Sequence, residues 1–258
     1  MLDTAQNIFL ALGWVALSIF GLILLNHFWS PSRRRVHNDV IGWQISILGT
    51  IYAVMIGFML YAVWANFQTA ETNADSEANA LINLFRSADG LPISQRDAID
   101  IAAVNYANAV VNEEFPTMHR NRTPIAGKPF VIQMWAIATQ TQATNFGQQA
   151  SLHQAMSELS SLTEHRRIRI LEASTAMPTI LWAVLVIGGV ITIASSCLIG
   201  SENVVLHYAL ICSLSLLISL ALIAIGDIDR PFQGSVHVGS NAFVNAQQTM
   251  LETQARPK

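Results

Sequence analysis

Long apolar runs and the polar stretches between them set the pattern of this chain. An α-helix rises about 1.5 Å per residue, so about 20 consecutive apolar residues cross the hydrocarbon of a bilayer. Four runs reach this length, and each is flanked by polar or charged residues. We therefore predict four transmembrane helices, over residues 7–29, 41–67, 178–199 and 204–226.

The segment between the second and third runs has a helical pattern of a different kind. The second helix continues as an amphipathic helix to about Asp89, and a further helix extends to about Glu114. Pro116 to Pro129 is typical of an exposed loop, and two more helices follow it, separated around Gly147. The pattern predicts an all-α, polytopic membrane protein with an extramembrane helical bundle inserted between the second and third spans. Its predicted parts are residues 1–67 (two spans), 68–177 (bundle), 178–226 (two spans) and 227–258 (a tail with an Asp-x-Asp-Arg-Pro-Phe-x-Gly element).

The second span has two chemically different faces. Its small residues recur at steps of three or four, which places them on one side of a helix, while Ile51 and Phe58 lie opposite. Small residues let membrane helices pack closely, but the same stripe could line a pore between several copies of the chain. The sequence alone does not choose between these explanations. The candidate pore-lining residues are Asn38, Gly42, Ser46, Gly49, Ala53 and Gly57.

Asn38 has a second explanation, because it stands where the second span begins. Its side chain could cap the helix by accepting hydrogen bonds from N–H groups of the first turn. As a pore residue it would instead form a polar ring at one mouth. Both explanations stay open at this point.

Charged residues gather near both ends of the second helix. Three arginines precede it and would concentrate anions, whereas three carboxylates follow the apolar part and would concentrate cations. These candidate mouth charges are Arg33, Arg34, Arg35, Glu71, Asp75 and Glu77.

The same arginines predict the orientation of the chain. Short loops rich in Lys and Arg stay in the cytoplasm, so the loop after the first span is expected inside. Because the number of spans is even, the bundle and both termini then lie on the other side. We expect a multi-pass protein of a bacterial inner membrane with an extracytoplasmic bundle.

A second charged region lies where the bundle meets the membrane spans. Arg166 and Arg169 precede the third span, and Asp227 and Asp229 end the fourth, so we expect the arginines to pair with the aspartates. The two carboxylates, with Phe232 nearby, could alternatively hold a cation or accept hydrogen bonds from N–H groups of a turn.

Composition removes several classes of function. Charged residues make up 12% of the chain and the formal net charge is -3, which argues against a nucleic-acid-binding surface. There is no HExxH, GxSxG or phosphate-loop motif, and the histidines have no paired ligand spacing. We therefore expect no enzyme, no cofactor and no metal site. The expected partners are membrane lipid, further copies of the chain and small inorganic ions.

Polar and aromatic landmarks run through most of the chain. They are His37-Asn38, Gly42, Tyr52, Gly57-Phe58, Trp64, Glu77-Ala78, Tyr106, Glu114-Phe115-Pro116, Arg166, Arg169, Asp229 and Pro231-Phe232-Gln233-Gly234. Together they resemble the bacterial bestrophin-like membrane proteins, with Phe115 as a departure where a Trp is more usual. The resemblance implies relatives of the bestrophins, which are pentameric anion channels gated by calcium, although no acidic calcium clasp can be matched. It also implies a cytoplasmic bundle, in conflict with the arginine-based prediction, which we retain here.

Two functions fit these observations. The first is an oligomeric ion channel whose second span lines the path, with the resemblance favouring anions such as chloride. The alternative is a non-conducting membrane scaffold or sensor whose helical bundle binds a partner. Burial of Gly49, Ala53 and Gly57 under other helices of the same chain would rule out the pore.

Overall fold

The computed structural model describes residues 4–254, and every regular element in this range is a helix. The all-α prediction is therefore confirmed. Four of the helices are long and apolar enough to cross a membrane, and they coincide with the four apolar runs. These helices are α1 (Thr4–Phe28), α3 (Asn38–Ala88), α8 (Thr179–Cys197) and α9 (Val204–Ile228). The N-terminal residues up to Asp3, which the sequence analysis placed outside the cytoplasm, lie outside the described residues.

The chain forms two compact units. The membrane unit holds the chain up to Asn66 together with Ala176–Asp229, and the bundle unit holds Phe67–Thr175 together with the chain from Arg230 onward. Helix α3 contributes residues to both units, as the unbroken helical pattern beyond its apolar part predicted.

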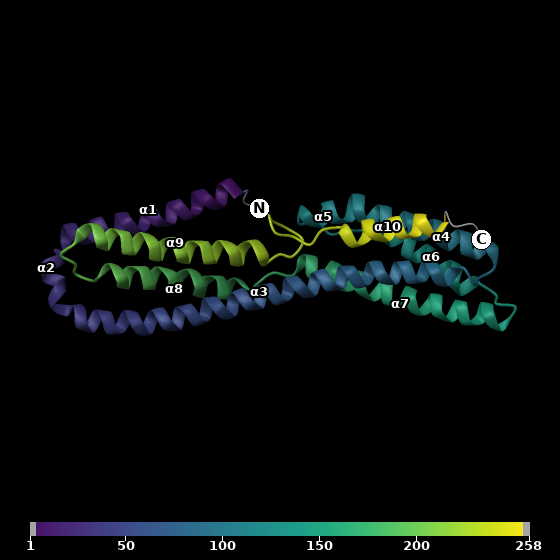
Figure 1. Ribbon diagram of the computed structural model, residues 1–258, viewed down its shortest axis with the longest axis horizontal. Helices are drawn as coiled ribbons and strands as arrows, with labels where there is room; N and C mark the ends of the chain where they lie inside the picture. Colours follow the sequence, from purple (N-terminus) through teal and green to yellow (C-terminus); the bar gives the residue numbers. More distant parts are fainter. Residues whose placement is uncertain (1–3, 255–258) are drawn as a thin grey trace. The chain divides into compact units, whose positions relative to one another are not determined.

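In the membrane unit, α9 packs against α1 and α8, and α3 joins them through its Tyr52 side (Figure 1). The Tyr52 ring lies against Gly188 and Gly189 of α8, where an added Cβ would come within 2.8 Å of it. The Tyr52 hydroxyl donates a hydrogen bond of 2.9 Å to the Leu185 carbonyl oxygen. Two glycines on α8 thus let α3 approach closely, as small residues do between membrane helices.

A second contact holds the start of α3. Two short turns, α2 (Pro31–Arg34) and η1 (Arg35–His37), connect α1 to α3. The Asn38 amide donates to the Gly200 carbonyl oxygen and accepts from the Gly200 N–H, both at 2.9 Å. The capping explanation for Asn38 was therefore wrong, because Asn38 has helical backbone angles and its side-chain oxygen accepts from Gly200 in the connection between α8 and α9.

The bundle unit consists of the last part of α3, the helices between α3 and α8, and the helix after α9 (Figure 1). Its core is filled mainly by alanine, leucine and aromatic side chains, among them Leu84, Tyr106 and Phe243. The helices are α4 (Ile93–Ala109), the π-helical turn η2 (Val110–Glu114), α5 (Phe115–His119), α6 (Lys128–Gln140), α7 (Phe146–Ser174) and α10 (Asn241–Gln254).

Two helix boundaries differ from the prediction. Pro116 does not end the helix before it but lies in the first turn of α5, where proline is tolerated because its missing N–H needs no partner. Gly147 lies within the first turn of α7, which begins after Asn145; the Asn145 side chain accepts a hydrogen bond of 2.8 Å from the Gln148 N–H. The break between α6 and α7 thus precedes Gly147.

Helix α10 lies in a region that the sequence analysis treated as a tail. It buries Phe243, Ala246 and Met250 in the bundle unit, against α4 and η2. Their spacing of three and four residues is the helical signal that could have found it.

Candidate functional site

The small-residue face of α3 is uncovered in this chain. A Cβ atom built on Gly42, Gly49 or Gly57 would have no heavy atom of another segment within 4 Å, as far as the structure describes the chain. Ser46 and Ala53, on the same face, are exposed. The condition that would have ruled out a pore is therefore not met.

Two hydroxyl groups add polarity on and beside this uncovered face. The Ser46 hydroxyl donates 2.9 Å to the Gly42 carbonyl oxygen, and the Thr50 hydroxyl donates 2.7 Å to the Ser46 carbonyl oxygen. Each hydroxyl keeps lone pairs that can accept further hydrogen bonds. Such groups are tolerated in a membrane without a partner helix and can also contact water.

The other sides of α3 differ from this face. Tyr52 and Val63 are buried against α8 and α9. Ile51 and Phe58 are 53% and 66% exposed and form a bulky apolar surface. The helix thus presents a packed side, a bulky apolar side suited to lipid, and a side of small residues that neither packs within the chain nor offers bulk to lipid.

The candidate mouth charges fall into two groups. Arg33 is exposed, and so are Glu71 and Asp75 on α3. Arg35 is exposed but forms an ion pair with Glu202. These side chains can contribute charge at the surface.

Two of the predicted mouth charges are buried, which corrects the prediction. Arg34 donates to the Asn26 side-chain oxygen and, at 2.8 Å, to the Cys197 carbonyl oxygen. Glu77 is fully buried in the bundle unit. Neither group can act as a surface charge, because each already has buried partners.

Glu77 belongs to a buried cluster of two carboxylates and two arginines. The Arg169 guanidinium donates to both Glu77 carboxylate oxygens, at 2.6 and 3.0 Å, and to Glu114 at 2.7 Å. Arg166 donates to the other Glu114 oxygen at 2.5 Å. Glu77, Glu114 and Arg169 are entirely buried, so α3, η2 and α7 are joined by charges that have no access to water.

Neutral groups complete this cluster. The Tyr106 hydroxyl of α4 donates to Glu77, and the Gly127 N–H donates to Glu114 at 2.8 Å. Phe115 and Phe243 lie against the Arg169 guanidinium, with ring centres 5.5 and 5.8 Å away. The cluster thus satisfies its charges on several sides, as buried ions require.

The cluster also changes the acidity of its members. Burial alone would lower the pKa of Arg169, but the Glu77 and Glu114 carboxylates beside it hold that pKa well above its ordinary value. Burial, together with the Glu77 charge, raises the pKa of Tyr106 well above its ordinary value. Arg169 is therefore charged and Tyr106 neutral at every physiological pH.

The predicted pairing of the arginines with the aspartates was wrong. Arg166 and Arg169 have their carboxylate partners within the bundle unit, on α3 and η2. Asp229 instead accepts a hydrogen bond of 2.8 Å from the Met177 N–H and one of 3.4 Å from the Trp182 indole N–H. It therefore connects the end of α9 to the start of α8, which matches the alternative of a carboxylate bonded to nearby N–H groups.

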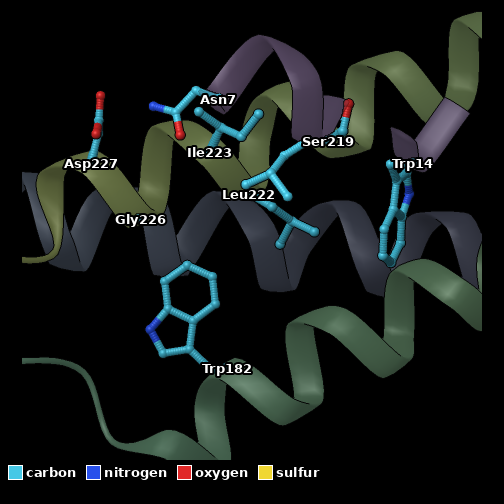
Figure 2. A pocket seen from close by; sticks show the side chains of 9 residues that line it. Asn7, Trp14, Trp182, Ser219, Leu222, Ile223, Gly226 and Asp227 are labelled. Carbon is cyan, nitrogen blue, oxygen red and sulfur yellow. The ribbon is translucent and has the colours of Figure 1, made fainter. Parts of the chain in front are cut away.

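The two remaining candidates lie in different surroundings. Phe232 is buried and packs edge-on against Phe115, with ring centres 6.0 Å apart. Asp227 lies at one end of a cavity of about 410 Å³ that α1, α8 and α9 enclose, with Asn7 and Trp182 nearby and Trp14 at the other end (Figure 2). The cavity wall is mainly apolar, which suits lipid chains more than ions.

Comparisons with known proteins decide the family. A model of the bestrophin-like domain matches residues 12–243 of this sequence. This chain belongs to the bestrophin-like family. No curated protein matches the sequence.

Comparison with solved structures shows that this chain has the bestrophin fold. A bacterial bestrophin homologue from Klebsiella pneumoniae, crystallised with a single substitution, aligns with a TM-score of 0.71 at 15% sequence identity, over 97% of this chain and 100% of the homologue. Another variant of that homologue aligns with a TM-score of 0.66 at 18% identity, over 96% and 99% of the two chains. The bestrophin fold thus covers nearly the whole chain.

The structure explains why several family landmarks occur far apart in the sequence. The charged and tyrosine members of the buried cluster are landmarks that lie on α3, α4, η2 and α7: Glu77, Tyr106, Glu114, Arg166 and Arg169. All five are landmarks of the resemblance, but nothing in the sequence shows that they meet.

Proposed function

We propose that several copies of this chain surround a central axis and form an ion channel, with the small-residue face of α3 lining the path. The observation that carries this proposal is the open space over Gly42, Gly49 and Gly57. A glycine-rich face gains nothing from contact with lipid tails, since it buries little apolar area, but it leaves room for ions at an axis between subunits. Membership of the bestrophin-like family supports the same arrangement.

Close packing within one chain would have been the simpler reason for this stripe. Where α8 approaches α3, the close contact is made by Tyr52 and not by the candidate pore residues. The α3 glycines therefore leave an open surface that no helix of the same chain fills.

The path is proposed to conduct anions, with chloride as the physiological example. Exposed Arg33 lies in α2, shortly before α3, and attracts anions. The hydroxyls of Ser46 and Thr50 can donate to a passing ion when they rotate away from their carbonyl partners. Exposed Glu71 and Asp75 oppose this preference at the other end of the apolar part. The measured preference for chloride or potassium therefore decides whether Arg33 or the two carboxylates dominate.

Ion flux from liposomes tests this proposal. Purified oligomers are reconstituted, and chloride and potassium gradients are imposed in separate experiments. We expect chloride flux well above that of protein-free liposomes and little potassium flux. Potassium flux alone would retain the channel but overturn its anion preference. Absence of both fluxes from correctly assembled oligomers would favour the membrane scaffold, with the bundle unit as the surface for a partner.

The orientation in the inner membrane is a separate proposal, which rests on Arg33, Arg34 and Arg35. It places the bundle unit outside the cytoplasm. A reporter enzyme that is active only in the periplasm, fused after the C-terminal residue, should therefore be active. Activity of a cytoplasmic reporter at the same position would contradict the arginine rule and agree with the topology that the family resemblance implied.

A further inference from the structure

Two histidines that are far apart in the sequence meet in the bundle unit. The rings of His119, in α5, and His237, in the segment before α10, have their centres 5.0 Å apart and are inclined by 56°. Both side chains are exposed, and both line a hollow of about 340 Å³. Phe115 and Phe232 also line this hollow, so the imidazoles stand beside an apolar wall.

The hydrogen bonding of His237 determines which of its nitrogens is available. Its Nδ1 lies 3.0 Å from the Gly234 carbonyl oxygen. A carbonyl oxygen can only accept, so Nδ1 carries the proton and donates it to this bond. The Nε2 atom of the neutral ring then holds a free lone pair. A backbone carbonyl that orients an imidazole in this way is the usual outer partner of a metal-binding histidine.

The distance between the rings fits one shared ion. A Zn²⁺ ion lies about 2.0–2.1 Å from a ligating imidazole nitrogen, which puts it about 3.2 Å from the ring centre. Two such rings at a tetrahedral angle have centres about 5 Å apart. The observed separation of 5.0 Å matches this spacing, so the rings stand at the distance that one shared ion requires.

We propose that His119 and His237 form a binding site for a borderline divalent transition-metal ion, of which Zn²⁺ is the example. Imidazole ligands suit Zn²⁺, Ni²⁺ and Cu²⁺ and do not suit Mg²⁺ or Ca²⁺. Among the described residues no group of three His, Cys, Asp or Glu side chains could hold a metal. Water therefore completes the coordination, and the ion exchanges with solvent, unlike the closed four-ligand sites of structural zinc.

The bound ion would add a link between two segments that already pack through Phe115 and Phe232 and share a hydrogen bond from Gln233 to Asn121. His119 ends α5, and His237 belongs to the connection between Phe232 and α10. Because the ion binds only when both are in place, it stabilises the folded bundle unit by mass action. This inference does not depend on ion conduction, so either proposal can fail without the other.

The test is zinc titration of the purified full-length protein, prepared without a histidine tag and followed by calorimetry. We expect one Zn²⁺ per chain for the wild type and a loss of affinity of at least about tenfold for His119→Ala and for His237→Ala. His153→Ala is the matched control, because His153 is also an exposed histidine but lies on another helix, α7. Its affinity should equal that of the wild type.

A spectroscopic measurement separates a two-histidine site from general surface binding. With one equivalent of Cu²⁺, the electron paramagnetic resonance spectrum of the wild type should show coupling to two nitrogens, and that of either variant to fewer. Zn²⁺ should also raise the melting temperature of the wild type but not that of the double variant, which combines His119→Ala with His237→Ala. Equal zinc binding by the wild type and the double variant, or no binding by the wild type, would overturn the proposal.

Discussion

Replacing Gly57 with tryptophan is expected to reduce chloride flux to the level of protein-free liposomes. Among the described residues, no heavy atom of another segment lies within 4 Å of a Cβ placed at this position, so the new side chain starts in open space in a single subunit. A tryptophan side chain occupies 150–250 Å² of surface, and copies from every subunit would converge on the axis. The substitution therefore removes the space that ions need. Flux assays on reconstituted oligomers measure this directly.

The matched control is Gly13→Trp. Gly13 also lies on a transmembrane helix, α1, and also has no atom of another segment within 4 Å. It is not on α3, so the same indole should leave the flux close to that of the wild type. If assembled wild-type and Gly57→Trp proteins conduct chloride equally, the path lies elsewhere than on this face of α3.

Replacing Arg169 with alanine is expected to destabilise the bundle unit by about 3–5 kcal/mol, the usual effect of breaking a buried ion pair. The loss is large because Glu77 and Glu114 would remain as buried carboxylates without their shared arginine. The purified variant should melt at a much lower temperature than the wild type, or fail to assemble. Thermal melting followed by size-exclusion chromatography shows either result.

Arg167→Ala is the control for this prediction. Arg167 is two residues away on α7, but its side chain is 73% exposed and pairs at the surface with Glu164. Surface pairs of this kind contribute about 0–1 kcal/mol. A double-mutant cycle of Arg169→Ala with Glu77→Ala should show strong coupling, because removing both partners leaves fewer unpaired charges than removing one. Additive effects, or an Arg169→Ala variant as stable as Arg167→Ala, would show that the cluster does not hold the bundle unit together.

The transmembrane part could be predicted well from the sequence because a bilayer imposes its length on every span. The four apolar runs became α1, α3, α8 and α9. The unbroken pattern beyond the second run correctly indicated that α3 continues to Ala88. These features depend on residues close together in the sequence.

The errors concern contacts between distant segments. Arg169 was placed on the correct helix, but periodicity does not tell which helix faces it, so Asp229 was chosen where Glu77 and Glu114 are the partners. For the same reason, neither explanation offered for Asn38, a local cap or a pore ring, included its actual partner, Gly200. Long-range partners of polar groups are set by the packing of the whole unit, which local pattern does not contain.

The candidate site was predicted in part. The small face of α3 was evident from its spacing, but whether other helices of the chain cover Gly49 or Gly57 required the structure. The resemblance supplied the residues of the buried cluster without their geometry. The meeting of His119 and His237 left no sequence signal, since the two are separated by most of the bundle and by two spans.

Accessibility of a cysteine at position 53 tests the central claim most directly. In a background of Cys197→Ala and Cys212→Ala, Ala53→Cys places a thiol on the small face of α3, and Ile51→Cys places one on the bulky face. Charged methanethiosulfonates react with thiols that water reaches. We expect these reagents to modify Ala53→Cys and to stop its chloride flux. Ile51→Cys, whose thiol faces lipid, should stay unmodified and continue to conduct. Modification of Ile51→Cys with Ala53→Cys unreactive and fully conducting would contradict the claim.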